Sequence, residues 1–369
     1  MPTIPLFSAQ AANAGLDFLS PITRVLDSHW YILGAELAAF EREFAEYCGV
    51  GHCVGLANGT DALELGLRAV GVKAGDEVVL AANAGFYGST AVRQIGAIPL
   101  YVDVDTNTLT MTVEQLELSL SSSTKAIIVT HLYGQLAPDL DSIVAVAGKA
   151  GLPVIEDCAQ AHGAKRNGKR AGSFGTIGCF SFYPTKNLGA VGDGGAVVTN
   201  EPSLAARLQG LRQYGWSSKY HVALEGGRNS RLDELQAAIL RAKLPLLDTW
   251  NAARRDIARR YSEAFSGLPV KCPNSLGDDY VAHLYVLQVS AREAFRNSLQ
   301  TKGIATDIHY PIADHLQEAY PCRPNQGPLP VSEQTCKQVV SLPCYPGLEA
   351  DKVDRVIHAV QSYFNQAGG

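Results

Sequence analysis

Apolar strand-like segments and amphipathic helix-like segments alternate along residues 57–158, and this alternation constrains the fold more than any other feature. DEVVLAA, IPLYVDVD, KAIIVTHLYG and LPVIEDC have the mostly apolar character of buried strands, and segments with a helical period separate them. Buried strands joined by helices form a mostly parallel sheet that is covered on both faces. The sequence therefore predicts an α/β fold that binds ligands at the carboxyl ends of its strands.

The length of the chain predicts more than one domain. Its 369 residues exceed an ordinary single domain, which favours one large domain and one smaller domain. A helical pattern runs from Asp233 to Phe265 with a break at Pro245, and we expect it to lead out of the large domain. We therefore expect a large domain over residues 1–249, including the N-terminal segment, and a small α+β domain over residues 250–369.

Composition excludes several classes of function. A formal net charge of −5 provides no basic field for nucleic acid or an anionic membrane. Eight scattered cysteines without a CxxC spacing argue against a metal site and against a disulfide framework. The N-terminal segment has the pattern of neither a signal peptide nor a membrane span. We expect a cytoplasmic protein that binds no nucleic acid, membrane or metal.

Two side chains that follow strand-like segments carry the strongest chemical signal. Asp157 closes the run LPVIED, and Lys186 follows the apolar segment GCFSFYP. A desolvated lysine can form a Schiff base, and a carboxylate can pair with a protonated pyridine nitrogen. Taken singly, Asp157 is as well explained as a helix cap and Lys186 as a solvated surface group. Together they predict an enzyme that uses pyridoxal phosphate (PLP).

The segment NGTDAL offers a site for the phosphate of such a cofactor. Gly59 and Thr60 precede an amphipathic helix whose free N–H groups and dipole favour an anion. The alternative is that Thr60 only caps the helix. Ser181 adds a hydroxyl donor. Phe86 and Tyr87 in AANAGFYGST are candidates for stacking on the ring, or for the core. The glycine-rich GDGGAV does not fit GxGxxG, which disfavours dinucleotide binding.

Several segments together resemble one known family. HWYILG, NGTDAL, EDCAQAHGA, SFYPTKNLGAVGDGGA, NSRLDELQAA and DIHYPI occur in the order and spacing of the DegT/DnrJ/EryC1/StrS sugar-nucleotide aminotransferases. The resemblance spans nearly the whole chain, and DCAQAHGA with SFYPTKNLGA is its most specific part. It implies an aspartate-aminotransferase-like fold (fold type I). It also implies a homodimer with active sites at the subunit interface.

The resemblance assigns roles to the candidate residues. It implies that Lys186 binds PLP covalently, that Asp157 binds the pyridinium nitrogen and that Gln160 approaches the ring hydroxyl or ring face. It further implies that Gly59, Thr60 and Ser181 hold the phosphate. The same phosphate would be reached by Asn229 of the neighbouring subunit, although Asn229 can instead belong to the approach of the helix that begins near Asp233.

Substrate contacts are the least specific part of the pattern. The candidates for contacts with the sugar or its phosphates are His162, Tyr183, Lys219, His309 and Tyr310. The histidines can also be ordinary hydrogen-bonded residues, and the lysine can be a surface group. AANAGFYGST shifts its aromatic residues relative to the commoner family segment. Which of Phe86 and Tyr87 stacks on the cofactor therefore stays open.

The predicted reaction is a PLP-dependent transamination from glutamate to a nucleotide-linked keto-deoxysugar, which gives an amino sugar nucleotide. DSHWYILG and DIHYPI resemble members that aminate C-3, so we expect a 3-keto, dTDP-linked substrate. A C-4 ketosugar aminotransferase is the alternative. A PLP-binding regulatory protein without turnover is a further alternative, which the lack of an appended DNA-binding segment disfavours. Lys186 argues against a related dehydratase branch that has histidine at this position.

Overall fold

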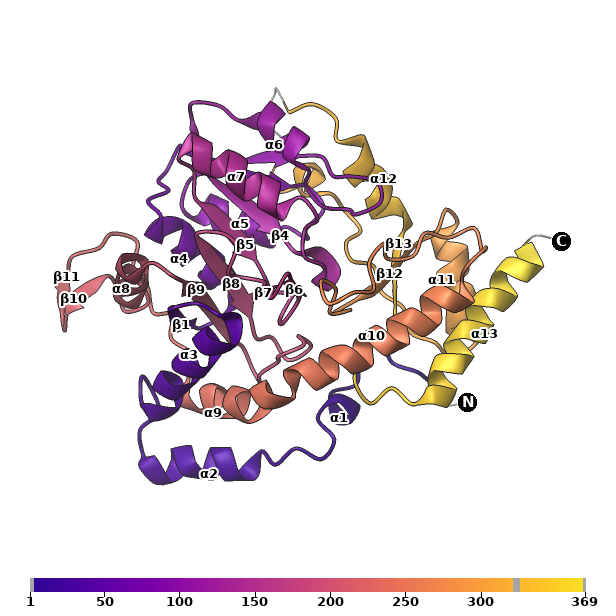
Figure 1. Cartoon of the computed structure of the whole chain (residues 1–369), viewed down its shortest axis with the longest axis horizontal. Coiled ribbons are helices and arrows are strands. Elements are labelled where there is room, and N and C mark those ends of the chain that lie inside the picture. The colour runs from indigo at the N-terminus through magenta and orange to yellow at the C-terminus, as the bar shows by residue number, and fades with distance from the viewer. Residues whose placement is uncertain (1–2, 321–325, 368–369) are drawn as a thin grey trace.

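A computed structural model describes residues 3–320 and 326–367 of the chain (Figure 1). Its centre is a seven-stranded sheet with the strand order β1-β9-β8-β5-β4-β2-β3. The pairs that involve β9 are antiparallel, and the other neighbours are parallel. The strands are β1 (His52–Leu56), β2 (Glu77–Ala81), β3 (Ile98–Val102), β4 (Thr124–Thr130), β5 (Val154–Asp157), β8 (Ile177–Ser181) and β9 (Gly195–Thr199). The predicted mostly parallel sheet is confirmed.

Helices cover both faces of this sheet because successive strand side chains point to opposite sides. On β2, Val78 and Leu80 belong to the core cluster beneath one set of helices, and Val79 belongs to the cluster on the other face. The first set is α4 (Gly59–Ala69), α5 (Tyr87–Gln94) and α8 (Pro202–Leu211). The second set is α3 (Ala35–Cys48), α6 (Val113–Ser119) and α7 (Leu140–Ala150), with α9 (Glu234–Lys243).

The helical pattern around Pro245 forms two helices joined by a short 3₁₀ turn. Helix α9 ends at Lys243, the turn spans Leu244–Leu246, and α10 spans Leu247–Ala264. Proline is tolerated at the first turn of a helix, so α10 can begin directly after it. Figure 1 shows α10 running from the sheet-containing part to the C-terminal elements. The predicted domain boundary near residue 250 falls within this helix and stays a prediction.

The C-terminal elements enclose their own core. They are β12 (Tyr285–Gln288), α11 (Arg292–Thr301), α12 (Pro330–Gln338), β13 (Val339–Leu342) and α13 (Ala350–Ala367), and β12 pairs with β13 in antiparallel fashion. Ile4 is fully buried in the same core and pairs with Ile304. Ile4 therefore packs against the C-terminal part of the chain. The predicted bounds place residue 4 in the large domain, and they stay a prediction. The bridge between Ile4 and Ile304 joins residues that lie 300 positions apart in the sequence, so no local sequence pattern predicts it.

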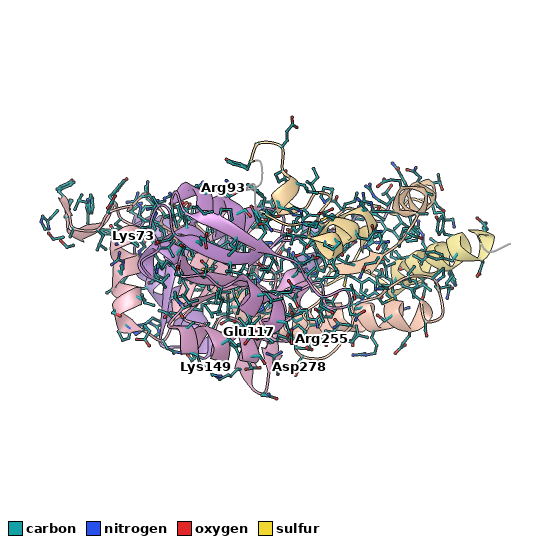
Figure 2. The ribbon with its side chains drawn as sticks, turned by 90° about the horizontal axis from the view of Figure 1, so that it is seen from above. Lys73, Arg93, Glu117, Lys149, Arg255 and Asp278 are labelled. Atoms are coloured by element: carbon teal, nitrogen blue, oxygen red, sulfur yellow. The ribbon has the colours of Figure 1, made fainter. Side chains whose placement is uncertain are left out.

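The remaining elements are not part of the central sheet. They are α1 (Ala9–Ala12), α2 (Leu19–Ser28), β6 (Lys165–Arg166), β7 (Lys169–Arg170), the 3₁₀ turns Leu132–Gly134 and Asp314–Leu316, and a hairpin of β10 (Trp216–Ser218) and β11 (His221–Val222). The hairpin projects beyond α8 in Figure 1. Lys149, Arg255 and Asp278 lie along one edge in Figure 2, where Arg255 Nη2 is 3.5 Å from Asp278 Oδ1. Within the described ranges, none of the helices has the length and apolar character needed to cross a membrane.

Candidate active site

A cavity of about 870 Å³ lies where the carboxyl ends of the central strands meet the C-terminal elements. Thr130, Asp157 and Ser181, the last residues of β4, β5 and β8, all line it. These strands are neighbours in the sheet, so their last side chains are brought to one place. Ligands of open α/β sheets bind at this edge. The cavity therefore occupies the position that the strand pattern predicts.

Asp157 and Lys186 both line this cavity. The Asp157 carboxylate is 6% exposed, accepts a hydrogen bond from Ala159 N at 3.1 Å and forms no salt bridge within the described part of the chain. Burial raises its pKa, against the opposing effect of the Lys186 charge. Burial also lowers the pKa of Lys186 to about 8. A buried carboxylate that has no ion-pair partner among the described residues and an amine with a pKa near 8 thus line the same cavity.

The N-terminus of α4 also lines the cavity. Asn58 caps the helix by accepting a hydrogen bond from Asp61 N at 2.8 Å, which leaves the N–H groups of Gly59 and Thr60 at the cavity. A Cβ atom at Gly59 would lie 2.6 Å from Ser181 Cβ, so only glycine lets the helix approach this strand so closely. Free N–H groups, the helix dipole and the Ser181 hydroxyl together favour an anion such as a phosphate.

Gln160 is held in a fixed orientation beside these residues. Its Oε1 accepts a hydrogen bond from Tyr133 N at 2.6 Å, and its Nε2 donates to the hydroxyl of Tyr310 at 3.0 Å. Tyr133 donates in turn to the carbonyl oxygen of His309. Gln160, His309 and Tyr310 all line the cavity, as does Tyr183. The segment around residue 310 is thereby attached to the wall that carries Asp157.

The two aromatic candidates in AANAGFYGST face different neighbours. Tyr87 lines the cavity and meets the ring of Tyr310 edge to face, with centroids 6.0 Å apart. The ring of Phe86 instead stacks on Tyr320 at 5.2 Å, and its backbone adopts a left-handed conformation with φ 71°. Of the two aromatic candidates, Tyr87 is therefore the one placed to contact a ligand in the cavity.

Three candidates lie away from this cavity wall. His162 is fully buried, packs against Phe180 and Phe182 and has a pKa lowered to about 3 by burial, so it belongs to the core. Asn229 pairs with Gln213 in an isolated bridge. Lys219 lies on the β10–β11 hairpin, with its amine over the ring of Tyr220. Neither Asn229 nor Lys219 is among the residues that line the cavity.

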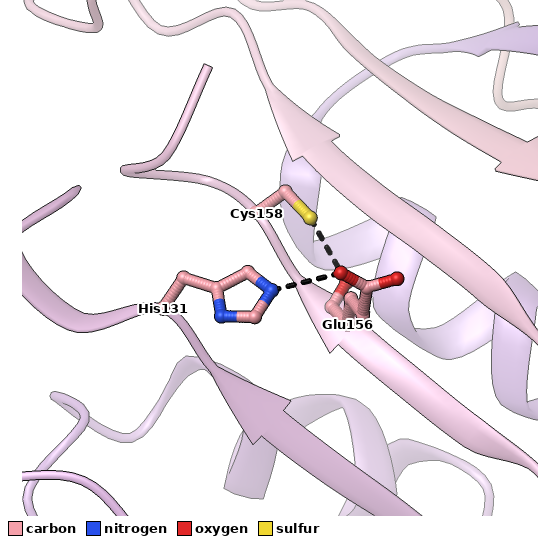
Figure 3. Close-up of side chains that lie close together, drawn as sticks. All are labelled: His131, Glu156 and Cys158. Atoms are coloured by element: carbon pink, nitrogen blue, oxygen red, sulfur yellow. Dashed lines mark hydrogen bonds and ion pairs between the residues drawn. The ribbon is translucent and has the colours of Figure 1, made fainter. Parts of the chain in front are cut away.

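A buried group beside the site has a structural explanation. His131, Glu156 and Cys158 place one potential ligand atom each within 4.8 Å of one another (Figure 3). The Glu156 oxygens already accept hydrogen bonds from the backbone N–H groups of Gly172, Phe174 and Gly175 as well as meeting the His131 ring. The carboxylate thus anchors the loop at residues 172–175 behind β5, and its acceptors are occupied by these donors.

Sequence reasoning missed two residues at the site. His283 lines the cavity, and its Nδ1 lies 3.0 Å from Oδ1 of Asn187, the residue after Lys186. Asp314 accepts a hydrogen bond from Phe86 N at 3.0 Å and one from the Ser89 hydroxyl at 2.6 Å, and so joins the C-terminal part to the loop that carries Tyr87. His283 lies within a sequence segment that has the pattern of a strand, and Asp314 lies within a polar segment that has the pattern of a loop. Neither offers a local signal.

Comparisons with known proteins identify the family of the chain. The sequence model of the DegT/DnrJ/EryC1/StrS aminotransferase family matches residues 14–361. A dTDP-3-amino-3,6-dideoxy-alpha-D-galactopyranose transaminase of Aneurinibacillus thermoaerophilus is 49% identical over 343 residues, which cover 93% of this chain and 94% of that protein. A dTDP-3-amino-3,4,6-trideoxy-alpha-D-glucose transaminase of Streptomyces venezuelae is 43% identical over 367 residues, which cover 98% of this chain and 96% of that protein.

A solved structure supports the same relationship. The crystal structure of S. venezuelae DesV in complex with a ketimine intermediate superimposes with a TM-score of 0.94 at 43% identity, covering 98% of this chain and 99% of that chain. The similarity extends over both the central sheet and the C-terminal elements. The fold class predicted from the sequence is therefore confirmed.

Proposed function

Because this chain belongs to the DegT/DnrJ/EryC1/StrS aminotransferase family, we propose that it transfers the amino group of glutamate to a nucleotide-linked keto-deoxysugar with PLP as cofactor. The family match and the structural likeness confirm the family, the fold type I architecture and the aminotransferase class expected from the sequence. The observation that carries the proposal for this site is the placement of Lys186 and Asp157 on the wall of one cavity.

The residues around the cavity fit PLP in three respects. Asp157 is a buried carboxylate without an ion-pair partner in the described chain, which suits a protonated pyridine nitrogen. The amine of Lys186 has no hydrogen-bond partner among the described residues and suits covalent attachment. Gly59, Thr60 and Ser181 would hold the phosphate by their N–H and hydroxyl groups. When bound, PLP supplies a carbonyl that reacts with amines and a ring that accepts electrons.

The side chains of the chain itself then handle protons and orientation. With a pKa near 8, Lys186 Nζ can both accept and release a proton close to neutral pH, as a general base and acid requires. Asp157 would keep the ring nitrogen protonated by its negative charge. Gln160, fixed by Tyr133 N and the Tyr310 hydroxyl, would orient the ring from one side. Tyr87 would cover the ring face.

The names of the relatives support a substrate that is aminated at C-3. Two of them, at 49% and 43% identity, are transaminases named for dTDP-linked 3-amino sugars. We therefore propose a dTDP-linked 3-keto-deoxysugar as the amino acceptor and the corresponding amino sugar nucleotide as the product. Tyr183, His309 and Tyr310, which line the cavity, are the proposed contacts to this substrate.

The proposal includes a homodimer whose subunits complete each other's sites. Asn229 and Lys219 lie away from the cavity of their own chain, and a second subunit would bring them to it. Exposed apolar side chains near the N-terminus support such an interface, since Leu19 is 76% and Trp30 is 63% exposed. The free cysteines of the described chain fit a reducing compartment, and we place the enzyme in the cytoplasm.

The test compares the purified protein with its Lys186→Ala variant. After loading with PLP, the wild type should show the absorbance of the lysine-bound cofactor and lose it on addition of glutamate, whereas the variant should do neither. Incubation of the wild type with dTDP-3-keto-6-deoxyglucose and glutamate should then give an amino sugar nucleotide and 2-oxoglutarate. Conversion of only a 4-keto sugar would move the reaction to C-4. Cofactor binding without turnover of any ketosugar would favour a regulatory protein.

A further inference from the structure

His283 is a buried imidazole at the cavity that has no role in the reaction described above. It is 7% exposed, lines the cavity and contacts Asn187, which directly follows Lys186. It precedes β12, so the C-terminal part of the chain supplies it. Because it lies near the reactive lysine, the hydrogen bonds that it can still form decide which group of the substrate it can contact.

The surrounding amides fix which nitrogen of His283 carries the proton. The carbonyl oxygen of His162 can only accept, so the group of Asn251 that lies 2.8 Å from it is the amide nitrogen. The oxygen of Asn251 then accepts from Asn187 Nδ2 at 2.8 Å, and the carbonyl oxygen of Val281 accepts from the same Nδ2 at 3.0 Å. The Asn187 side chain therefore presents its oxygen to the imidazole.

That oxygen accepts a hydrogen bond from His283 Nδ1 at 3.0 Å, so the proton of the neutral ring is on Nδ1. Burial and the charge of Lys186 lower the pKa of His283 well below its ordinary value, which keeps the ring neutral. In this tautomer Nε2 carries a lone pair and no proton. Among the described residues, none donates a hydrogen bond to it.

His283 lines the cavity, so a ligand group that donates a hydrogen bond can satisfy this lone pair in place of water. Carboxylates and phosphates are acceptors and would be repelled, which excludes the carboxylate groups of glutamate and the nucleotide diphosphate. The hydroxyl groups of a sugar and the amino group of glutamate are donors, and the reaction of the His283 variants with glutamate separates the two. We propose that His283 Nε2 accepts a hydrogen bond from a hydroxyl group of the sugar in the nucleotide-sugar substrate, and so contributes to substrate specificity. This inference rests on the proposed function.

Two substitutions separate this role from a purely structural one. The amide nitrogen of His283→Asn can occupy the place of Nδ1, which keeps the bond to Asn187 and removes the acceptor at the cavity. The amide of His283→Gln reaches the place of Nε2, which keeps an acceptor at the cavity and loses the bond to Asn187. We expect His283→Asn to raise the KM for the ketosugar about 10-fold, and His283→Gln to stay closer to the wild type.

Two further measurements make the test specific. The rate at which glutamate converts the bound cofactor should stay within about twofold of the wild type in His283→Asn, because glutamate brings no hydroxyl group. Calorimetric titration should show weaker binding of dTDP-glucose by His283→Asn and unchanged binding of dTDP, which lacks the sugar. If His283→Asn behaves as wild type while His283→Gln is impaired, the bond to Asn187 is what matters and the proposal is wrong.

A loss of the glutamate reaction in His283→Asn equal to the loss with ketosugar would likewise overturn the proposal, because it would place His283 at the amine and not at the sugar. Failure of the wild type to aminate any ketosugar would contradict the proposed function. In that case the comparison of dTDP-glucose with dTDP still decides whether His283 binds the sugar.

Discussion

At the residue scale, burial acts on the two central groups in opposite directions. It lowers the pKa of the Lys186 amine and raises the pKa of the Asp157 carboxyl, since both charged forms lose solvation. With a pKa near 8, a fraction of the lysine is neutral near physiological pH, and this neutral amine is a nucleophile and a proton acceptor. An aspartate that has no ionic partner in residues 3–320 and 326–367 favours a cationic ring nitrogen. The same burial thus prepares both groups for one ligand.

The pKa of Lys186 predicts the pH dependence of cofactor capture. Because only the neutral amine reacts, the rate of PLP capture by the apoenzyme should rise with pH and level off above about pH 8, well below the 10.5 of an ordinary lysine. Stopped-flow absorbance between pH 6 and pH 10 measures this rate. The signal should be absent in Lys186→Ala. A rate that still rises tenfold per pH unit at pH 9.5 would contradict the lowered pKa.

Replacement of Asp157 should damage turnover more than cofactor binding. Asp157→Asn keeps the size of the side chain and removes the negative charge that would hold a proton on the ring nitrogen. We expect kcat to fall about 100-fold or more, with PLP affinity changed by less than about tenfold. Absorbance titration gives the affinity, and steady-state assays give kcat. Equal losses in both would mean that Asp157 serves mainly to bind the cofactor.

At the element scale, the close contact between α4 and β8 shapes the predicted phosphate site. In Gly59→Ala, the new Cβ would come 2.6 Å from Ser181 Cβ, so the helix end must move and its N–H groups leave their position. We expect PLP binding to weaken about tenfold or more. Gly148→Ala in α7 is the matched control, because no atom lies within 4 Å of its Cβ position. That control should leave PLP binding unchanged.

Asp314 connects two parts of the molecule through a carboxyl that is 1% exposed. It accepts hydrogen bonds from Phe86 N and the Ser89 hydroxyl, and its own N–H donates to the carbonyl oxygen of Ala82. Burial raises its pKa from 3.8 to about 7. The loop that carries Tyr87 is thereby attached to the segment that carries Tyr310, and both line the cavity.

This raised pKa predicts a pH effect on stability. A folded pKa above the unfolded value stabilises the folded state at pH values below the unfolded pKa, and this contribution is lost as pH rises toward the folded pKa. The free energy of unfolding of the wild type, relative to Asp314→Asn, should therefore fall by about 1 to 4 kcal/mol as pH rises from 4 to 7. Urea unfolding at several pH values measures it. A constant difference would contradict the assignment.

The sequence predicts those helices and strands whose pattern of apolar residues is local. The apolar strand text and the helical periods predict β2 to β5 and the helices between them, and Asp157 and Lys186 follow strand ends. Contacts between distant residues give no such signal. Asp314 meets Phe86 across 228 residues, and His283 meets Asn187 across 96. The pairing of Ile4 with Ile304 is likewise invisible without the fold.

At the scale of the whole molecule, the site spans parts that no single element supplies. The sheet contributes Asp157 and the strand-end hydroxyl of Ser181, while the C-terminal part contributes His283 and Tyr310. Lys219 lies on a hairpin that projects away from the rest of the chain (Figure 1). An exposed arm with a lysine and aromatic neighbours suits a ligand that carries phosphates, if a second subunit presents the cavity.

Subunit mixing tests this arrangement, because each site of the proposed dimer combines Lys186 of one chain with Lys219 of the other. Lys186→Ala should be inactive, and Lys219→Ala should have a raised KM for the nucleotide sugar. In a mixed dimer, one site carries both substitutions and the other carries neither. After an equal mixture of the two variants is unfolded and refolded, about a quarter of all active sites should therefore be intact. These sites should have the wild-type KM. If Lys219 served its own chain, each intact Lys186 would still face a substituted Lys219, and mixing would restore no site with a wild-type KM.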